Sequence, residues 1–90
     1  MAEDRLDIDT KTIEDNSDLR QVEFEGEVSE ERYQFEVQYD VLEALSTVSP
    51  EGEAVTIFKQ HAEEIAQLGV VALARDPEQE IVVISENDLD

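Results

Sequence analysis

Apolar and polar residues alternate in two neighbouring segments of the first half of the chain. Residues with an apolar side chain, or with none, occupy every second position from Val22 to Val28, and a second alternation runs from Tyr33 to Tyr39. A period of two is typical of a β-strand with one buried and one wet face. Residues 29–32 carry no apolar side chain and predict a turn, so the two segments predict an antiparallel hairpin. Both tyrosines fall on its inward face, where we expect core packing rather than ligand stacking.

The apolar faces of the hairpin also predict a register. Like charges in directly opposed positions destabilise a sheet, and this register contains one such pair. We therefore expect added salt to stabilise the fold. The pairs that keep the apolar faces together are Val28 with Tyr33, Phe24 with Val37, and Glu25 with Glu36.

A short helix is expected directly after the hairpin. Asp40, with Glu43 three residues later, is a variant of the capping box that marks a helix N-terminus. The helix should end at Ser49, because the residue before a proline avoids the α region. The side chains expected to point inward are Val41, Leu42, Leu45 and Val48.

A second, long helix is expected from Ser49-Pro50-Glu51 to Ala74. Serine suits the cap, proline suits the first position, and glutamate meets the positive end of the helix dipole. Asp76-Pro77 should end the helix. Gly69 inside it costs about 1 kcal/mol relative to alanine, so we expect it to permit the close approach of another element. The apolar stripe of this helix is Ala54, Ile57, Phe58, Ile65, Leu68, Ala72 and Leu73.

Residues 81–84 form a continuous β-branched run, which predicts a strand buried on both faces. Its second face needs cover, either from a second copy of the chain or from apolar residues near the N-terminus. The latter residues are Leu6, Ile8, Ile13 and Leu19.

The order of these elements predicts an α+β domain. Its small antiparallel sheet would contain the hairpin, the C-terminal strand and, if Leu6–Ile8 pairs, an N-terminal edge strand. Two helices, one of them long, would pack on this sheet. We place the single domain at residues 19–85, a partly ordered acidic N-terminal arm at 1–18, and a frayed acidic tail at 86–90.

The chain has 90 residues, which suffices for one domain with a modest core. Its 25 Asp and Glu against 6 Lys and Arg give a formal net charge of −19. Such a surface repels phosphate backbones and anionic lipids, so we expect no direct binding to nucleic acid or membranes. Three interpretations stay open: a solvated surface, a polyanion that imitates nucleic acid, and diffuse attraction to a basic protein. Residues 50–75 carry only −2 and should be the most buried.

No arrangement of residues typical of catalysis or of a cofactor is apparent. The sequence has no cysteine, which excludes disulfides and thiolate metal sites. Asp7-Ile8-Asp9 begins like a calcium loop, but Lys11 and Thr12 stand where a ligand and a glycine are needed. His61 lies on the flank of the apolar stripe of the long helix, where we expect it to pack and make one hydrogen bond. We therefore predict no catalytic, cofactor-binding or metal-binding residues.

The start of the chain and its hydropathy predict a location. Met1 is followed by Ala-Glu-Asp rather than by a basic and then an apolar stretch, so we expect no signal peptide. No apolar run approaches the ~20 residues that a membrane span needs. We expect a soluble, cytoplasmic protein.

Several of these segments resemble a small family of uncharacterised bacterial proteins, domain-of-unknown-function family 1488. The family pattern departs at Ala62, where an arginine is common, and at Gly69, where alanine is usual. The resemblance spans about residues 6–88 and implies the fold just described, but no enzyme activity, cofactor or catalytic residue. The matching positions are Val22-Glu23-Phe24, Tyr33–Leu45, Phe58-Lys59-Gln60-His61, Ile65, Gly69 and Ile81–Ile84.

These observations favour a non-enzymatic domain that acts through protein contacts. Its partners would be a second copy of the chain, as a homodimer, or a basic protein. One alternative is a nucleic-acid mimic that inhibits a basic protein, which requires carboxylates along one face about 6–7 Å apart. Another is a small-ligand binder, which requires a pocket with convergent polar groups.

Overall fold

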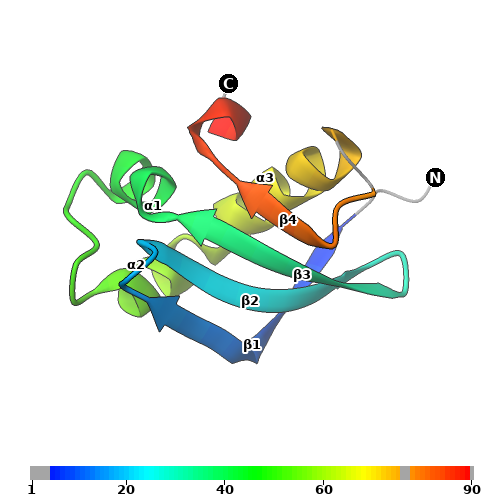
Figure 1. Cartoon of the computed structure of the whole chain (residues 1–90), viewed down its shortest axis with the longest axis horizontal. Coiled ribbons are helices and arrows are strands. Elements are labelled where there is room, and N and C mark those ends of the chain that lie inside the picture. The colour runs from blue at the N-terminus through cyan, green and yellow to red at the C-terminus, as the bar shows by residue number, and fades with distance from the viewer. Residues whose placement is uncertain (1–4, 76–77, 90) are drawn as a thin grey trace.

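A computed structural model describes residues 5–75 and 78–89. The chain forms one four-stranded sheet, in the strand order β1-β2-β3-β4, with helices packed against it (Figure 1). The α+β class predicted from the sequence is confirmed. The elements are β1 (Leu6–Asn16), β2 (Gln21–Val28), β3 (Glu31–Gln38), α1 (Tyr39–Ser46), α2 (Ala54–Gln60), α3 (Ala62–Arg75), β4 (Ile81–Ile84) and a 3-10 turn, η1 (Glu86–Leu89).

The segment predicted as an acidic arm contains the longest strand of the sheet. β1 is antiparallel to β2, with Leu6 opposite Val28, and its register shifts at an irregularity between Asp9 and Glu14. The N-terminal edge strand is therefore present and longer than Leu6–Ile8. Leu6 is only 4% exposed, so this strand contributes to the core. Residues 1–4 of the arm lie outside the described residues.

The hairpin of β2 and β3 forms as predicted, but its predicted register is wrong by two residues. The turn contains only Ser29 and Glu30, with φ angles of 53° and 70°. Positive φ at both central residues matches the twist of the flanking strands and makes a tight two-residue connection. Phe24 therefore pairs with Phe35, and the glutamate opposite Glu36 is Glu23 rather than Glu25.

Helix α1 begins and ends earlier than predicted. Gln38 precedes its first turn and no side chain caps it, so Asp40 lies inside the first turn instead of at the cap. There the carboxylate still faces the positive end of the helix dipole. Thr47, with φ of 63°, ends the helix before Ser49. Val41 and Leu42 are buried and Leu45 is half-buried, whereas Val48 is 49% exposed.

The single long helix that was predicted is two helices, α2 and α3. Residues 51–53 form a turn, so α2 begins at Ala54 and not at Pro50. At His61 the backbone leaves the helical region, with φ of −115° and ψ of 25°. The break lets α2 pack on β1 and β2 while α3 packs on β1 and β4. Asp76-Pro77, the predicted helix end, lies outside the described residues.

Strand β4 pairs parallel to β3, so the sheet is mixed and not purely antiparallel as predicted. Parallel neighbours require a crossover, and the three helices between β3 and β4 supply it. The prediction that β4 is buried on both faces is also wrong. Val82 and Ile84 are fully buried, but Ile81 is 36% exposed and Val83 is half-buried. The N-terminal strand does not cover them, because β1 lies at the opposite edge of the sheet.

The core lies between the sheet and the helices. Phe24 stacks on Phe35 at a centroid distance of 5.2 Å and meets the edge of Phe58 at 4.8 Å. Residues 86–89, predicted to be frayed, fold back as η1. There Asp88 is 5% exposed and accepts a bond from the Ser85 backbone N–H at 3.0 Å. Asp90 lies outside the described residues.

Two glycines let β1 approach its neighbours closely. A Cβ atom at Gly69 would lie 2.6 Å from a terminal methyl group of Leu6, which explains the close approach predicted for this position. A Cβ atom at Gly26 would lie 2.5 Å from another methyl group of Leu6 and 2.8 Å from the backbone oxygen of Asp7. A leucine side chain can turn aside, but the paired backbone of β1 cannot.

We expect Gly26→Ala to destabilise the protein by about 1–3 kcal/mol, the usual cost of overpacking. Gly69→Ala should cost less, because the higher helix propensity of alanine offsets part of the clash. Urea unfolding of both variants measures the difference. A Gly26→Ala variant as stable as the wild type would contradict the close approach of β1 and β2.

Candidate functional site

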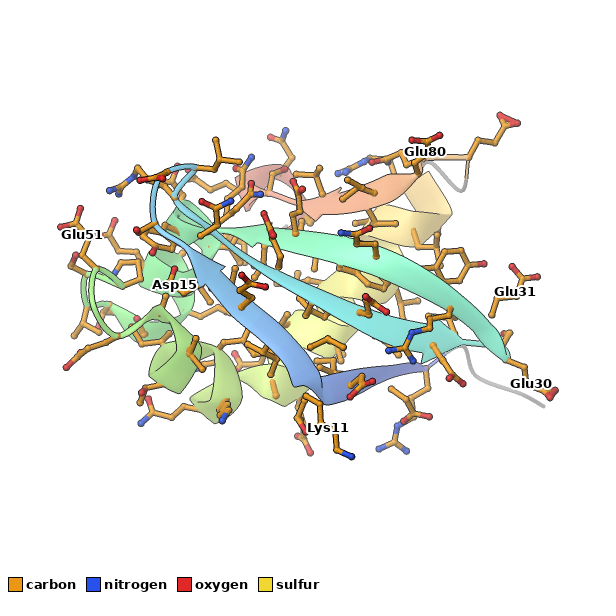
Figure 2. The ribbon with its side chains drawn as sticks, turned by 60° about the horizontal axis from the view of Figure 1, so that its bottom comes forward. Lys11, Asp15, Glu30, Glu31, Glu51 and Glu80 are labelled. Atoms are coloured by element: carbon orange, nitrogen blue, oxygen red, sulfur yellow. The ribbon has the colours of Figure 1, made fainter. Side chains whose placement is uncertain are left out.

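The helices α2 and α3 pack against one face of the sheet, and the other face is turned toward the viewer in Figure 2, with the helices behind it. Residues paired across a sheet point to the same face. The pairings therefore place the polar positions of β1, β2 and β3 together with Ile81 and Val83 of β4 on this second face, here called the open face. Its residues are Asp7, Asp9, Glu14, Asn16, Gln21, Glu23, Glu25, Glu27, Arg32, Gln34, Glu36, Gln38, Ile81 and Val83.

The charges of the open face are ordered in rows across the strands. Seven carboxylates and one guanidinium lie on this face, a formal charge of −6. Most of the polar side chains in these rows are exposed or half-buried. The three rows are Asp7–Glu27–Arg32, Asp9–Glu25–Gln34–Ile81 and Glu14–Glu23–Glu36–Val83.

Arg32 holds one end of the open face together. Its guanidinium donates to Asp9 and Glu25 at 2.7 Å each and lies 3.6 Å from Glu27. The hydrogen bond from Arg32, and a second from the Lys11 backbone N–H, lower the pKa of Asp9 below its ordinary 3.8. Arg32 itself is 44% exposed, so these are surface ion pairs that water and salt screen.

The row Glu14–Glu23–Glu36 has a different character. Within residues 5–75 and 78–89, no cation forms an ion pair with any of the three. Glu23 instead accepts hydrogen bonds from the amides of Asn16 and Gln21, at 3.0 and 2.8 Å, which lower its pKa. The central glutamate is therefore kept ionised beside two others. This row is an anionic ridge without a counter-charge from the described chain.

The helix side of the molecule offers a groove of about 620 Å³ between β1 and α3. Its lining is mixed. The apolar residues are Leu6, Ile8, Ala62, Ala66 and Val70, and the polar ones are Arg5, Asp7, Thr10, Glu63 and Gln67. The volume is within the range of small-molecule sites.

The residues singled out from the sequence are scattered. His61 lies at the break between α2 and α3, where its Nδ1 is 2.8 Å from a carboxylate oxygen of Glu64. Tyr39 is 2% exposed; its hydroxyl donates to Asp15, and burial first, then this bond, raises its pKa to about 12. Tyr33 is half-buried against the edge of Phe35.

Asp7 and Asp9 both point from β1 toward the open face, and no group of three or more His, Cys, Asp or Glu side chains in the described residues could hold a metal ion. Among those residues, no helix has the length and apolar character to cross a bilayer.

Half of the open face can be recognised from the sequence and half cannot. The alternation of glutamates along β2 places Glu23, Glu25 and Glu27 on one wet face. Asp7, Asp9 and Glu14 join this face only because β1 pairs with β2. The sequence suggests such a strand for Leu6–Ile8 alone. A period of two in Leu6-Asp7-Ile8 is the only local signal of it.

No family model matches the sequence, and no curated protein matches it. A solved structure does: a protein of unknown function from the DUF1488 family of Shewanella loihica PV-4. The two chains are 14% identical, and the match covers 93% of this chain and 96% of the other with a TM-score of 0.70. The fold is that of the DUF1488 protein. The resemblance inferred from the sequence is thereby confirmed for the fold.

The pairing of Arg32 with Asp9 predicts a change that NMR can measure. In Arg32→Gln the pKa of Asp9 should rise toward or above 3.8, because the first cause of its lowering is removed. A pKa that is lower in the folded chain stabilises the fold above the unfolded value, and this contribution is lost as the pH falls through the folded pKa. Carboxyl NMR titration checks it. Arg20→Gln, which removes an exposed partner of Glu51, should leave the pKa of Asp9 unchanged.

The anionic ridge predicts an effect of salt. Glu36→Gln should raise the free energy of unfolding at low ionic strength by about 0.2–1 kcal/mol, because it removes the repulsion between Glu36 and the opposed Glu23. In 1 M salt, where charges are screened beyond about 3 Å, most of this gain should disappear. Glu78→Gln removes the same charge outside the sheet and is the control. Equal gains in both variants would count against a specific repulsion within the row.

Proposed function

We propose that this protein is a cytoplasmic, non-enzymatic interaction domain whose open face binds a basic surface of another protein. The observation that carries the proposal is the gathering of seven carboxylates in rows on one face of the sheet. Arg32 neutralises little of this charge, and the ridge of Glu14, Glu23 and Glu36 has no cationic neighbour among the described residues.

The distribution of charge supports recognition rather than solvation alone. A surface that only keeps a protein soluble needs no particular arrangement of its charges. Here residues 50–75, which include α2 and α3, carry a formal charge of only −2, while the open face carries −6. Such asymmetry orients the molecule in an electric field and steers a basic partner to one side.

The proposal is non-enzymatic because, among the described residues, no set of side chains suited to catalysis comes together. An active site needs a nucleophile, acid or base with a partner that tunes it. The groove between β1 and α3 brings together Arg5, Glu63 and apolar side chains without such a pair. Its open, mixed lining favours neither a small substrate nor a cofactor.

A nucleic-acid mimic is a second candidate, favoured by the spacing of charge along β2. Alternate residues of an antiparallel strand are about 6.8 Å apart, so Glu23, Glu25 and Glu27 form a line with this repeat. This falls within the spacing of about 6–7 Å that a phosphate strand requires. A partner captured through such mimicry should be released by competing DNA or RNA, whereas a partner without a nucleic-acid site should not.

Capture from a lysate of the native host tests the proposed function. We compare the wild type with Glu14→Gln/Glu36→Gln, which removes two charges from the open face, and with Glu43→Gln/Glu63→Gln, which removes two from the helices. The wild type and the helix variant should retain the same basic protein in low salt and lose it in high salt, and the open-face variant should not retain it. Equal capture by all three would contradict the proposal, as would no capture at either salt concentration.

A further inference from the structure

We propose that the basic partner presents an extended segment that adds to β4 as a fifth strand of the sheet. This inference rests on the proposed function and specifies how the partner is recognised. β4 ends the strand order, so one of its edges faces away from β3 (Figure 1). Main-chain hydrogen bonds to such an edge are a common mode of peptide recognition, with side chains adding specificity.

The apolar end of the open face lies on this strand. Ile81 is 36% exposed and Val83 is half-buried, and these two end the second and third rows of the open face. A fifth strand would lie about 4.8 Å further along the same rows. Every second side chain of it would then cover Ile81 or Val83, which lack that cover in the free protein.

The opposite edge of the sheet is less suited to an added strand. β1 has an irregular register between Asp9 and Glu14, and irregularities of this kind protect edges from pairing. Within that stretch the Lys11 backbone N–H donates to the Asp9 side chain, and the Thr12 hydroxyl donates to the Asp9 backbone oxygen. β4 is paired without interruption from Ile81 to Ile84.

The charge around β4 selects a basic segment over a second copy of this chain. Glu36 lies beside Val83 on the open face, and exposed Glu78 precedes the strand. Glu80, also exposed, lies directly before the strand (Figure 2). A second copy would bring the same carboxylates and a further formal charge of −19 to this edge. A lysine or arginine on the open face of an incoming strand would instead lay its aliphatic stem over Ile81 or Val83 and extend its charge toward these glutamates.

One hydrogen bond must be exchanged on binding. Arg75 donates to the Val83 backbone oxygen at 3.2 Å while it also bonds the buried carboxylate of Asp88. Arg75 is 44% exposed, so a backbone N–H of the partner could replace it at Val83 and leave its bond to Asp88 in place.

Two peptides of equal charge test the inference by NMR titration. The probe is a capped decapeptide that alternates lysine and valine; its control is the same peptide N-methylated at every residue, which removes the backbone donors. The probe should shift the amide signals of residues 81–84 most and slow their exchange. The control should bind about tenfold more weakly or worse, because it cannot donate main-chain hydrogen bonds to the edge of β4.

A pair of protein variants gives a second, independent measurement. Val83→Lys should weaken binding of the probe by about fivefold or more, because it removes apolar cover and adds like charge at the edge. Val71→Lys makes the same change at a 51% exposed position of α3 and should bind as the wild type does.

The outcomes separate this inference from the proposed function. Equal binding of both peptides to the open face, or equal binding by the two variants, overturns the fifth strand and leaves the basic partner in place. No binding of either peptide at low ionic strength overturns both. A dimer in sedimentation that Val83→Lys dissociates would show that a second copy, and not a basic segment, occupies this edge.

Discussion

The packing of Phe24 against Phe35 and Phe58 is the contact on which the rest of the structure depends. It joins two neighbouring strands to α2 at the centre of the core. Because strands have a period of two, fixing Phe24 toward the helices also fixes Glu23 and Glu25 toward water. The same interaction that holds the layers together thus creates the charged face. The alternation of apolar and acidic residues along β2 therefore determines both the core packing and the candidate site.

The charged face lowers the stability of the folded protein. Like charges in opposed positions repel, and Glu23 lies between Glu14 and Glu36 in one row of the sheet. The structure offsets this locally, with amide donors around Glu23 and one guanidinium among the carboxylates at the other end. The burial of the opposite face supplies the remaining stabilisation. A bound basic partner would relieve the same repulsion.

Sequence periodicity predicted those parts of the fold that local patterns determine. The hairpin, both helical regions and the last strand follow from the hydrophobic period, although the predicted caps were wrong, and the face of β2 follows with them. The register did not, because Ser29-Glu30 adopts a turn conformation that glycine and asparagine usually mark. The break at His61 and the parallel pairing of β4 also have no local signal, since both result from packing between distant elements. For the same reason the sequence missed the three carboxylates that β1 adds to the open face.

The parallel pairing of β3 with β4 makes the outermost strand dependent on the crossover. Gln34 and Ile81 are partners although 47 positions separate them, whereas β1, β2 and β3 are joined by short turns. Closing a loop of this length costs entropy that only the packed helices recover. Because local pairings form faster than distant ones, we expect the three antiparallel strands to assemble first and β4 to join after the helices. A loosening of α3 in the native protein would therefore release β4 before any other strand.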